Sequence, residues 1–164
     1  MGARAVLVRG PSGAGKSRLV LDLIEASARG RLAFARLVAD DRVHVEAVHD
    51  RVIVRPPLAL AGLLEVRGLG ILQLPFEPVA AVGLVVDLGA AAPRLPEAAH
   101  RRAEVAGVTV RRVAVAPGCD PLPLVLAAAT HPLATDVPGG CGRSLAFQPL
   151  KVPLPCGLAT SVTW

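Results

Sequence analysis

Eight consecutive residues near the start of the chain have the order of a phosphate-binding P-loop. The pattern is a glycine, four residues and Gly-Lys-Ser, here Gly10, Pro11, Ser12, Gly13, Ala14, Gly15, Lys16 and Ser17. The glycines allow successive backbone N–H groups to converge on phosphate oxygens. Lys16 is expected to reach the β- and γ-phosphates of a nucleotide, and the Ser17 hydroxyl to bind Mg²⁺. The pattern predicts binding of a nucleoside triphosphate or a polyphosphate.

The segments on both sides of this loop fit that prediction. Residues 3–8 are mostly apolar and include two valines, which indicates a buried strand. After the loop, Leu19, Val20, Leu23 and Ile24 lie on one face of a predicted helix. A glycine-rich turn without a ligand is the alternative, and a strand and a helix in these positions favour the phosphate site.

Two acids form the second candidate feature. Asp40 and Asp41 follow a short apolar segment at 36–39 that is predicted to be a buried strand. A carboxylate beside a phosphate loop can hold Mg²⁺ or accept a proton from the attacking group. Aspartate is also common in surface turns. The position of the pair, one helix and one strand after the loop, favours a functional role.

The third candidate feature is the segment from Leu64 to Ile71. Glu65 and Arg67 are two residues apart, so on an extended chain both side chains point to the same side. The glycines that follow indicate a close approach of the backbone to another group. A strand with an exposed ion pair and a glycine turn explains the pattern equally well, and both interpretations stay open.

The rest of the chain is predicted to form one domain at 1–134 and an irregular tail rich in Gly and Pro at 135–164. Alternation of Val43, Val45 and Ala47 suggests a strand with one face in solvent. The further predicted elements are strands at 43–48, 51–55, 80–88 and 108–115, a helical turn within 96–105 and a helix at 121–131.

Composition excludes several classes of protein. The net charge is +5, but the arginines are scattered and aromatic residues make up only 2%, so no nucleic-acid partner is expected. No apolar run is long enough for a membrane span, and no signal peptide is expected before the first strand. Cys119, Cys141 and Cys156 lack metal-site spacing and are predicted to be free thiols rather than a metal site with His131. These features predict a cytoplasmic protein.

Three blocks, in this order, resemble the C-terminal catalytic domain of the HPr kinase/phosphorylase family. They are the P-loop at 10–17, Leu37-Val38-Ala39-Asp40-Asp41-Arg42-Val43, and Leu64-Glu65-Val66-Arg67-Gly68-Leu69-Gly70-Ile71. The resemblance implies an α/β P-loop kinase domain similar to phosphoenolpyruvate carboxykinase, with a mixed β-sheet and flanking helices. It also implies an ATP- and Mg²⁺-dependent kinase that phosphorylates a serine of HPr, the phosphocarrier protein of the sugar phosphotransferase system. Many members also reverse this reaction by phosphorolysis, and hexamers are implied.

The same resemblance implies roles for individual residues. Lys16 would contact the nucleotide phosphates, and Asp41 would take the proton from the substrate serine. Arg67 would belong to a segment needed in both directions, and Arg94 would match a later catalytic arginine of the family. The metal-binding residues would be Ser17, Asp40 and Glu65.

Two departures from the family pattern bear on activity. The family has a histidine upstream of the first strand, and this chain begins too late to contain it. The phosphorylase segment, Pro-Gly-Arg-Asn in the family, reads Pro117-Gly118-Cys119-Asp120. Loss of the arginine predicts that kinase activity exceeds phosphorylase activity. The alternatives are a small-molecule P-loop kinase and a nucleotide-binding module without catalysis.

Overall fold

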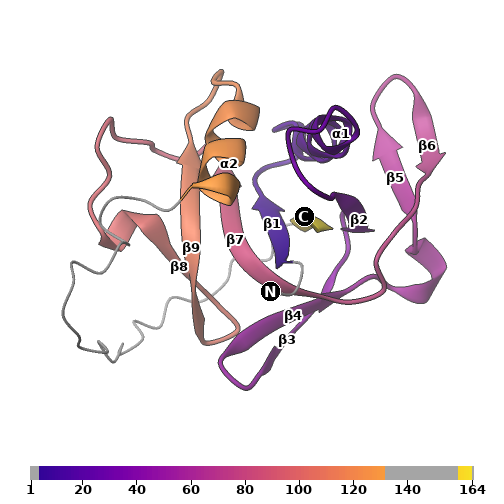
Figure 1. The fold of residues 1–164 in the computed structure, drawn as a ribbon, viewed down its shortest axis with the longest axis horizontal. Coiled ribbons are helices and arrows are strands. Elements are labelled where there is room, and N and C mark those ends of the chain that lie inside the picture. Colours follow the sequence, from indigo (N-terminus) through magenta and orange to yellow (C-terminus); the bar gives the residue numbers. More distant parts are fainter. Residues whose placement is uncertain (1–3, 132–158, 164) are drawn as a thin grey trace.

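The structure, a computed structural model, describes residues 4–131 and 159–163 (Figure 1). Its central layer is a sheet in which β2, β10, β1, β7, β4 and β3 are neighbours in that order, with β9 and β8 added beside β7. β5 and β6 form a separate two-stranded sheet. The strands are β1 (Arg4–Arg9), β2 (Arg36–Ala39), β3 (His44–Val48), β4 (Arg51–Arg55), β5 (Leu63–Val66), β6 (Gly70–Gln73), β7 (Ala80–Leu88), β8 (Arg102–Val105), β9 (Val108–Val115) and β10 (Ala159–Thr163). The helices are α1 (Lys16–Ala28) and α2 (Pro121–Thr130), with 3₁₀ turns η1 (Leu58–Leu60) and η2 (Ala99–Arg101).

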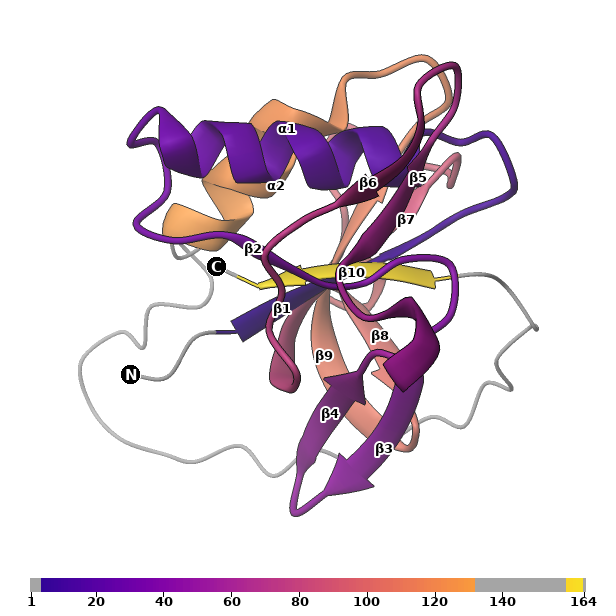
Figure 2. The same ribbon diagram turned by 90° about the vertical axis from the view of Figure 1, so that its right-hand side faces the viewer.

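Both α-helices cover the same face of the central sheet (Figures 1 and 2). The predicted apolar face of α1 is confirmed, because Leu19, Val20 and Leu23 are buried against Val6 and Val8 of β1. Ile24 is partly buried at the margin of the same core. Helix α2 begins at Pro121, within the helix predicted at 121–131, and the Asp120 side chain caps it by accepting the N–H of Leu122. The α/β class with a mixed sheet and flanking helices is confirmed.

The opposite face of the sheet carries a second core made of strand side chains. Leu7 of β1 and Val85 of β7 pack there with Val52 of β4, and Val105 and Val110 belong to the same cluster. The hairpin of β3 and β4 projects from this side of the sheet, at the bottom of the view in Figure 1. Only β4 buries side chains in that hairpin: all five residues of β3 are exposed. The sequence predicted one solvent-facing side for this strand, and in β3, which is the last strand of the sheet order, both sides face solvent.

The direction of the strands brings several loops to one edge of the sheet. β1, β7 and β9 are parallel, and β10 is antiparallel to both β1 and β2. β1 and β2 therefore run in the same direction, and the carboxyl ends of β1, β2, β7 and β9 share an edge. In open α/β sheets this edge is where ligands bind. The 10–17 loop follows β1 there, and Asp40 and Asp41 follow β2.

Two parts of the chain differ from their predictions. Residues 159–163 were expected in an irregular tail, yet they form β10 between β1 and β2, and the rest of that tail lies outside the described residues. β8 was not predicted, since a helical turn was expected within 96–105, and only η2 has helical geometry there. β10 depends on partners far away in the sequence, β1 and β2, so it leaves no local signature. β8 pairs with the adjacent β9 in a tight hairpin.

Residues 63–73 form a hairpin. Glu65 lies in β5, and the chain turns at 67–69 before β6 begins, so the single extended segment expected from Glu65 to Arg67 is wrong. The turn closes through the N–H of Leu69, which donates to the carbonyl of Val66 at 3.0 Å. Gly68 has φ +83°, a left-handed conformation that glycine adopts readily.

Within the described residues, neither α-helix is long and apolar enough to cross a membrane.

Candidate active site

The 10–17 loop leads directly from β1 into the first turn of α1. Gly13 and Gly15 have φ of +80° and +90°, left-handed conformations that side chains disfavour. The N–H of Ala14 donates to the carbonyl of Pro11 at 3.2 Å, which closes a tight turn inside the loop. Gly15 precedes α1 and offers no side chain to cap its N–H groups. The first N–H groups of the helix thus keep their capacity to bind an anion.

Lys16 is buried in this loop. Its exposure is 6%, and Nζ donates to the carbonyl oxygens of Gly10 and Pro11, at 3.2 Å each. Among the described residues no carboxylate pairs with this ammonium. A buried charge without a counter-charge is unfavourable. An anion such as phosphate would supply the missing charge.

Asp40 links three elements at the same edge. The Ser17 hydroxyl, in the first turn of α1, donates to Asp40 Oδ1 at 3.4 Å. The backbone N–H of Glu65 in β5 donates to Oδ2 at 2.8 Å. Asp40 is partly buried, whereas Asp41 beside it is exposed. The structure therefore brings together the loop, Asp40 and the Glu65 segment.

Arg67 extends from the β5–β6 turn over the 10–17 loop. Its Nη2 and Nη1 lie 3.7 and 3.8 Å from the place that a Cβ on Gly13 would occupy. Figure 2 shows the tip of this hairpin beside the N-terminal end of α1. Two cations, Lys16 and Arg67, therefore border the loop, one buried and one exposed.

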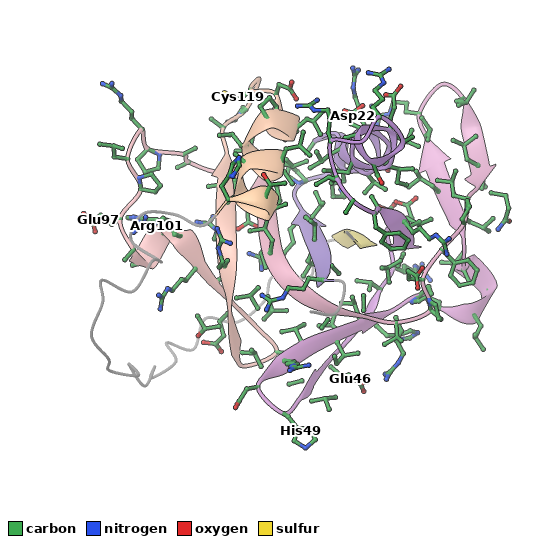
Figure 3. The ribbon with its side chains drawn as sticks, in the orientation of Figure 1. Asp22, Glu46, His49, Glu97, Arg101 and Cys119 are labelled. Atoms are coloured by element: carbon green, nitrogen blue, oxygen red, sulfur yellow. The ribbon has the colours of Figure 1, made fainter. Side chains whose placement is uncertain are left out.

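Other candidate residues lie elsewhere. Arg94 is exposed in the loop after β7, and Figure 1 shows this loop on the side of β9 that faces away from β5 and β6. Arg94 makes no hydrogen bond or ion pair with the described residues. His49 lies at the tip of the β3–β4 hairpin, at the end of the molecule opposite to α1 (Figure 3). Arg94 is thus not brought to the site, and His49 is remote from it as well.

The junction of α1 and α2 lies beside this edge. Cys119 is exposed in the turn that precedes α2, on the same side of the sheet as Asp22 of α1 (Figure 3). Burial raises the pKa of Asp22, and the carboxylates of Asp120 and Glu25 raise it further, while Arg18 opposes them. Asp120 thus contributes to the electrostatic environment of Asp22 in α1.

The oxygen atoms present fit a magnesium ion that is shared with phosphates. Ser17 Oγ and Asp40 Oδ1 are 3.4 Å apart, and both are the hard donors that Mg²⁺ prefers. The described residues include no group of three or more His, Cys, Asp or Glu side chains arranged to hold a metal. Mg²⁺ usually takes one or two protein ligands and completes its shell with water and substrate phosphates. The donor set suits that mode of binding.

A charged network that the sequence analysis missed joins three strands at this edge. Arg9 Nε donates to Asp87 Oδ1 at 2.7 Å and Nη2 to Oδ2 at 2.8 Å. Arg112 Nε donates to Asp87 Oδ2 at 2.5 Å, and its Nη1 to the carbonyl of His100 at 3.2 Å. Burial acts to raise the pKa of Asp87, but hydrogen bonds and charge from the two arginines outweigh it and lower that pKa. The sequence signal that could have predicted this network is a charged residue within each of three mostly apolar strands.

We expect Asp87→Asn to remove part of the acid sensitivity of folding. Because the pKa of Asp87 is lowered in the folded state, its stabilisation is complete above the unfolded value of about 3.9 and disappears as pH falls through the folded pKa. At pH 7 the variant should lose about 1–3 kcal/mol, since two arginines lose their counter-charge. Urea unfolding at pH 7 and pH 3 should show a smaller difference between wild type and variant at pH 3. Equal differences at both pH values would contradict the expectation.

The three sequence blocks lie in a region that matches a known protein family. Residues 2–77 match the family model described as HPr Serine kinase C-terminal domain. All three sequence blocks named above fall within this match. The HPr kinase/phosphorylase of Clostridium tetani is 44% identical over 70 residues, and that of Clostridium acetobutylicum is 41% identical over 70 residues. Each alignment covers 43% of this chain and 21% of the relative, so the match spans about a fifth of the curated relatives' length.

The fold has a counterpart among solved structures. The HPr(Ser) kinase/phosphatase from Coxiella burnetii superposes with a TM-score of 0.58 at 24% sequence identity. The superposition covers 76% of this chain and 79% of that structure. It therefore extends beyond the residues that match in sequence and shows the shared fold. The resemblance of this chain to the HPr kinase family, expected from three short blocks, is confirmed.

Proposed function

We propose that this chain is an ATP- and Mg²⁺-dependent kinase that phosphorylates a serine of an HPr-like phosphocarrier protein in the cytoplasm. The observation that carries the proposal is the arrangement around Asp40. Its carboxylate is hydrogen-bonded both to Ser17, next to the buried Lys16, and to the backbone of Glu65. A glycine-rich turn without a ligand gives no reason for a buried lysine without a carboxylate partner.

Nucleotide binding would use the 10–17 loop. The N–H groups of the loop and of the first turn of α1 would donate to phosphate oxygens. The Lys16 ammonium would exchange its contacts with the carbonyls of Gly10 and Pro11 for the β- and γ-phosphates. Arg67, whose guanidinium lies near Gly13, would face the charge that develops on the transferred phosphoryl group.

Metal binding would use the neighbouring oxygens. Ser17 and Asp40 would hold Mg²⁺, and Glu65 would add a carboxylate from β5. When bound, Mg²⁺ neutralises charge on the β- and γ-phosphates. The hydrogen bond from the Glu65 N–H keeps Asp40 aimed at Ser17, so the hairpin fixes the orientation of the acid.

Transfer requires activation of the acceptor, since a serine hydroxyl is a weak nucleophile. Asp41 would accept the serine proton as the serine oxygen forms its bond to the γ-phosphorus and the bond to the leaving ADP oxygen breaks. The exposure of Asp41, beside the partly buried Asp40, suits an acceptor that arrives on the surface of another protein. Asp41 would thus accept the proton, and Asp40 would bind the metal.

Incubation with HPr, Mg²⁺ and γ-labelled ATP tests the proposal. We expect label on a serine of HPr, and none on HPr whose acceptor serine is replaced by alanine. Label on a small metabolite instead would establish a small-molecule kinase. ATP binding without transfer to either acceptor would establish a nucleotide-binding module, and no ATP binding would refute the nucleotide site.

The reverse reaction provides a second measurement on the same proteins. Because Cys119 stands where the family pattern has arginine, we expect inorganic phosphate to release phosphate from phosphorylated HPr more slowly than the kinase adds it. Equal rates would contradict this ordering.

Mass measurement in solution will show whether the hexameric assembly implied by the family resemblance forms.

A further inference from the structure

The end of β7, with Gly89 after it, lies against the end of β1 and the start of the 10–17 loop at three successive positions. The Asp87 carboxylate holds the Arg9 guanidinium through two hydrogen bonds. A Cβ on Gly10 would lie 3.0 Å from the carbonyl oxygen of Leu88, so the two backbones touch there. A Cβ on Gly89 would lie 3.8 Å from the Pro11 ring. The end of β7 thus forms a support along which the loop begins.

This support extends to Lys16 through backbone carbonyls. The residues that rest on Leu88 and Gly89 are Gly10 and Pro11, and their carbonyl oxygens accept the hydrogen bonds from Lys16 Nζ. The Pro11 carbonyl also accepts the N–H of Ala14. A shift of Gly10 and Pro11 would therefore move both the ammonium and the turn of the loop.

Asp87 is the charged member of this support, and it is well fixed. Its side chain is 15% exposed, and both carboxylate oxygens are occupied by arginines. Arg112 is held in turn by the carbonyl of His100, so the network is tied to three strands and to η2. A two-pronged contact between arginine and carboxylate restrains direction as well as distance. Arg9 is thereby restrained immediately before the loop starts.

We propose that Asp87 is a positioning residue for the 10–17 loop: through Arg9 it fixes Gly10 and Pro11, whose carbonyls hold Lys16 in place for a triphosphate. The effect on nucleotide binding rests on the proposed function, whereas the effect on the loop does not. Asp87 lies on the face of the sheet that carries Leu7 and Val85, opposite to the helices. It acts through the loop and does not touch the nucleotide.

The test compares Asp87→Asn with wild type in two measurements. The first is amide hydrogen exchange, without nucleotide, of peptides covering the 10–17 loop and the remainder of α1. We expect exchange in the loop to become faster by a larger factor than exchange in α1 from Leu19 onward, where any increase reflects the lower global stability of the variant. The second is the dissociation constant for ATP, which should rise about 2- to 30-fold, the range for mutations that act through neighbouring residues. The turnover rate at saturating ATP should change much less.

Two further variants keep the test decisive. Arg9→Lys retains the charge but loses the two-pronged contact with Asp87. We expect it to raise loop exchange and the ATP dissociation constant in the same direction, by a smaller factor. This variant replaces Asp87→Asn in the test if Asp87→Asn does not fold. Glu77→Gln breaks the exposed ion pair with Arg36, which is remote from the loop, and should leave loop exchange and ATP affinity unchanged. Unchanged loop exchange in Asp87→Asn, an equal acceleration in the loop and in α1, or equal effects in Glu77→Gln would overturn the inference. Absence of ATP binding by wild type would refute the nucleotide site alone, because hydrogen exchange still decides the role of Asp87.

Discussion

Replacement of Asp41 by asparagine is expected to slow phosphoryl transfer to HPr about 100- to 10,000-fold, the usual contribution of a general base. Asparagine has nearly the same shape but cannot accept the serine proton at neutral pH. Asp41 is exposed and follows β2 without being part of it, so the variant should fold normally. Affinity for ATP should stay near the wild-type value, because Lys16 and the 10–17 loop are unchanged. Single-turnover transfer of labelled phosphate measures the first effect, and fluorescent ATP binding the second.

Asp50→Asn provides the matched control for this experiment. Asp50 is also exposed, and it lies in the turn between β3 and β4 with φ +21°. That turn belongs to the hairpin at the end of the molecule opposite to α1. The control should transfer phosphate at the wild-type rate. Comparable transfer by Asp41→Asn and wild type would remove Asp41 from the mechanism and leave the acceptor proton to another group.

Lys16→Met is expected to weaken ATP binding about 10- to 100-fold, since hydrogen bonds to a charged group contribute about 1.5–3 kcal/mol. Transfer at saturating ATP should fall by a further factor of about 100 to 1,000, as when one preorganised donor to transition-state charge is removed. Without nucleotide, the folded state should not be destabilised, because methionine removes a buried ammonium whose partners among the described residues are two carbonyl oxygens. Calorimetric ATP binding and thermal unfolding without ligand test both parts.

Arg18→Met is the control for the loss of positive charge near the loop. Arg18 lies two residues further along α1, its side chain is 85% exposed, and its partner is Asp22. Removal of this cation should change ATP affinity less than about threefold, because exposed charges are screened by solvent and salt. An equal loss of affinity in both variants would show that general electrostatic attraction, rather than the position of Lys16, accounts for binding. Wild-type affinity in Lys16→Met would exclude the loop as the phosphate site.

Local sequence patterns predicted the parts of the site that depend on neighbouring residues. The 10–17 loop could be predicted because its spacing and glycines encode a turn that needs no distant partner. Asp40 could be placed because an apolar strand that ends in an acid, one helix after the loop, reaches the same sheet edge in a parallel arrangement. Its hydrogen bond to Ser17 follows from that shared edge.

Features that depend on distant partners could not be predicted. β10 pairs with strands more than a hundred residues away, so nothing in residues 159–163 indicates its place. Arg67 was expected on a strand and lies in a turn, because Gly68 and Gly70 favour reversal of the chain. Asp87 was part of a predicted apolar strand. The pattern of that strand does not predict that Arg9 and Arg112, from two other strands, bind the Asp87 carboxylate.

The position of β10 has a consequence for synthesis of the protein on the ribosome. β1 and β2 carry the loop and the acid pair, yet they do not touch along the sheet, because residues 159–163 lie between them. A growing chain that already contains both strands cannot register them until those five residues have left the exit tunnel. The edge that gathers Lys16 and Asp40 is thus assembled late, and nascent chains up to about residue 158 should be unable to hold ATP.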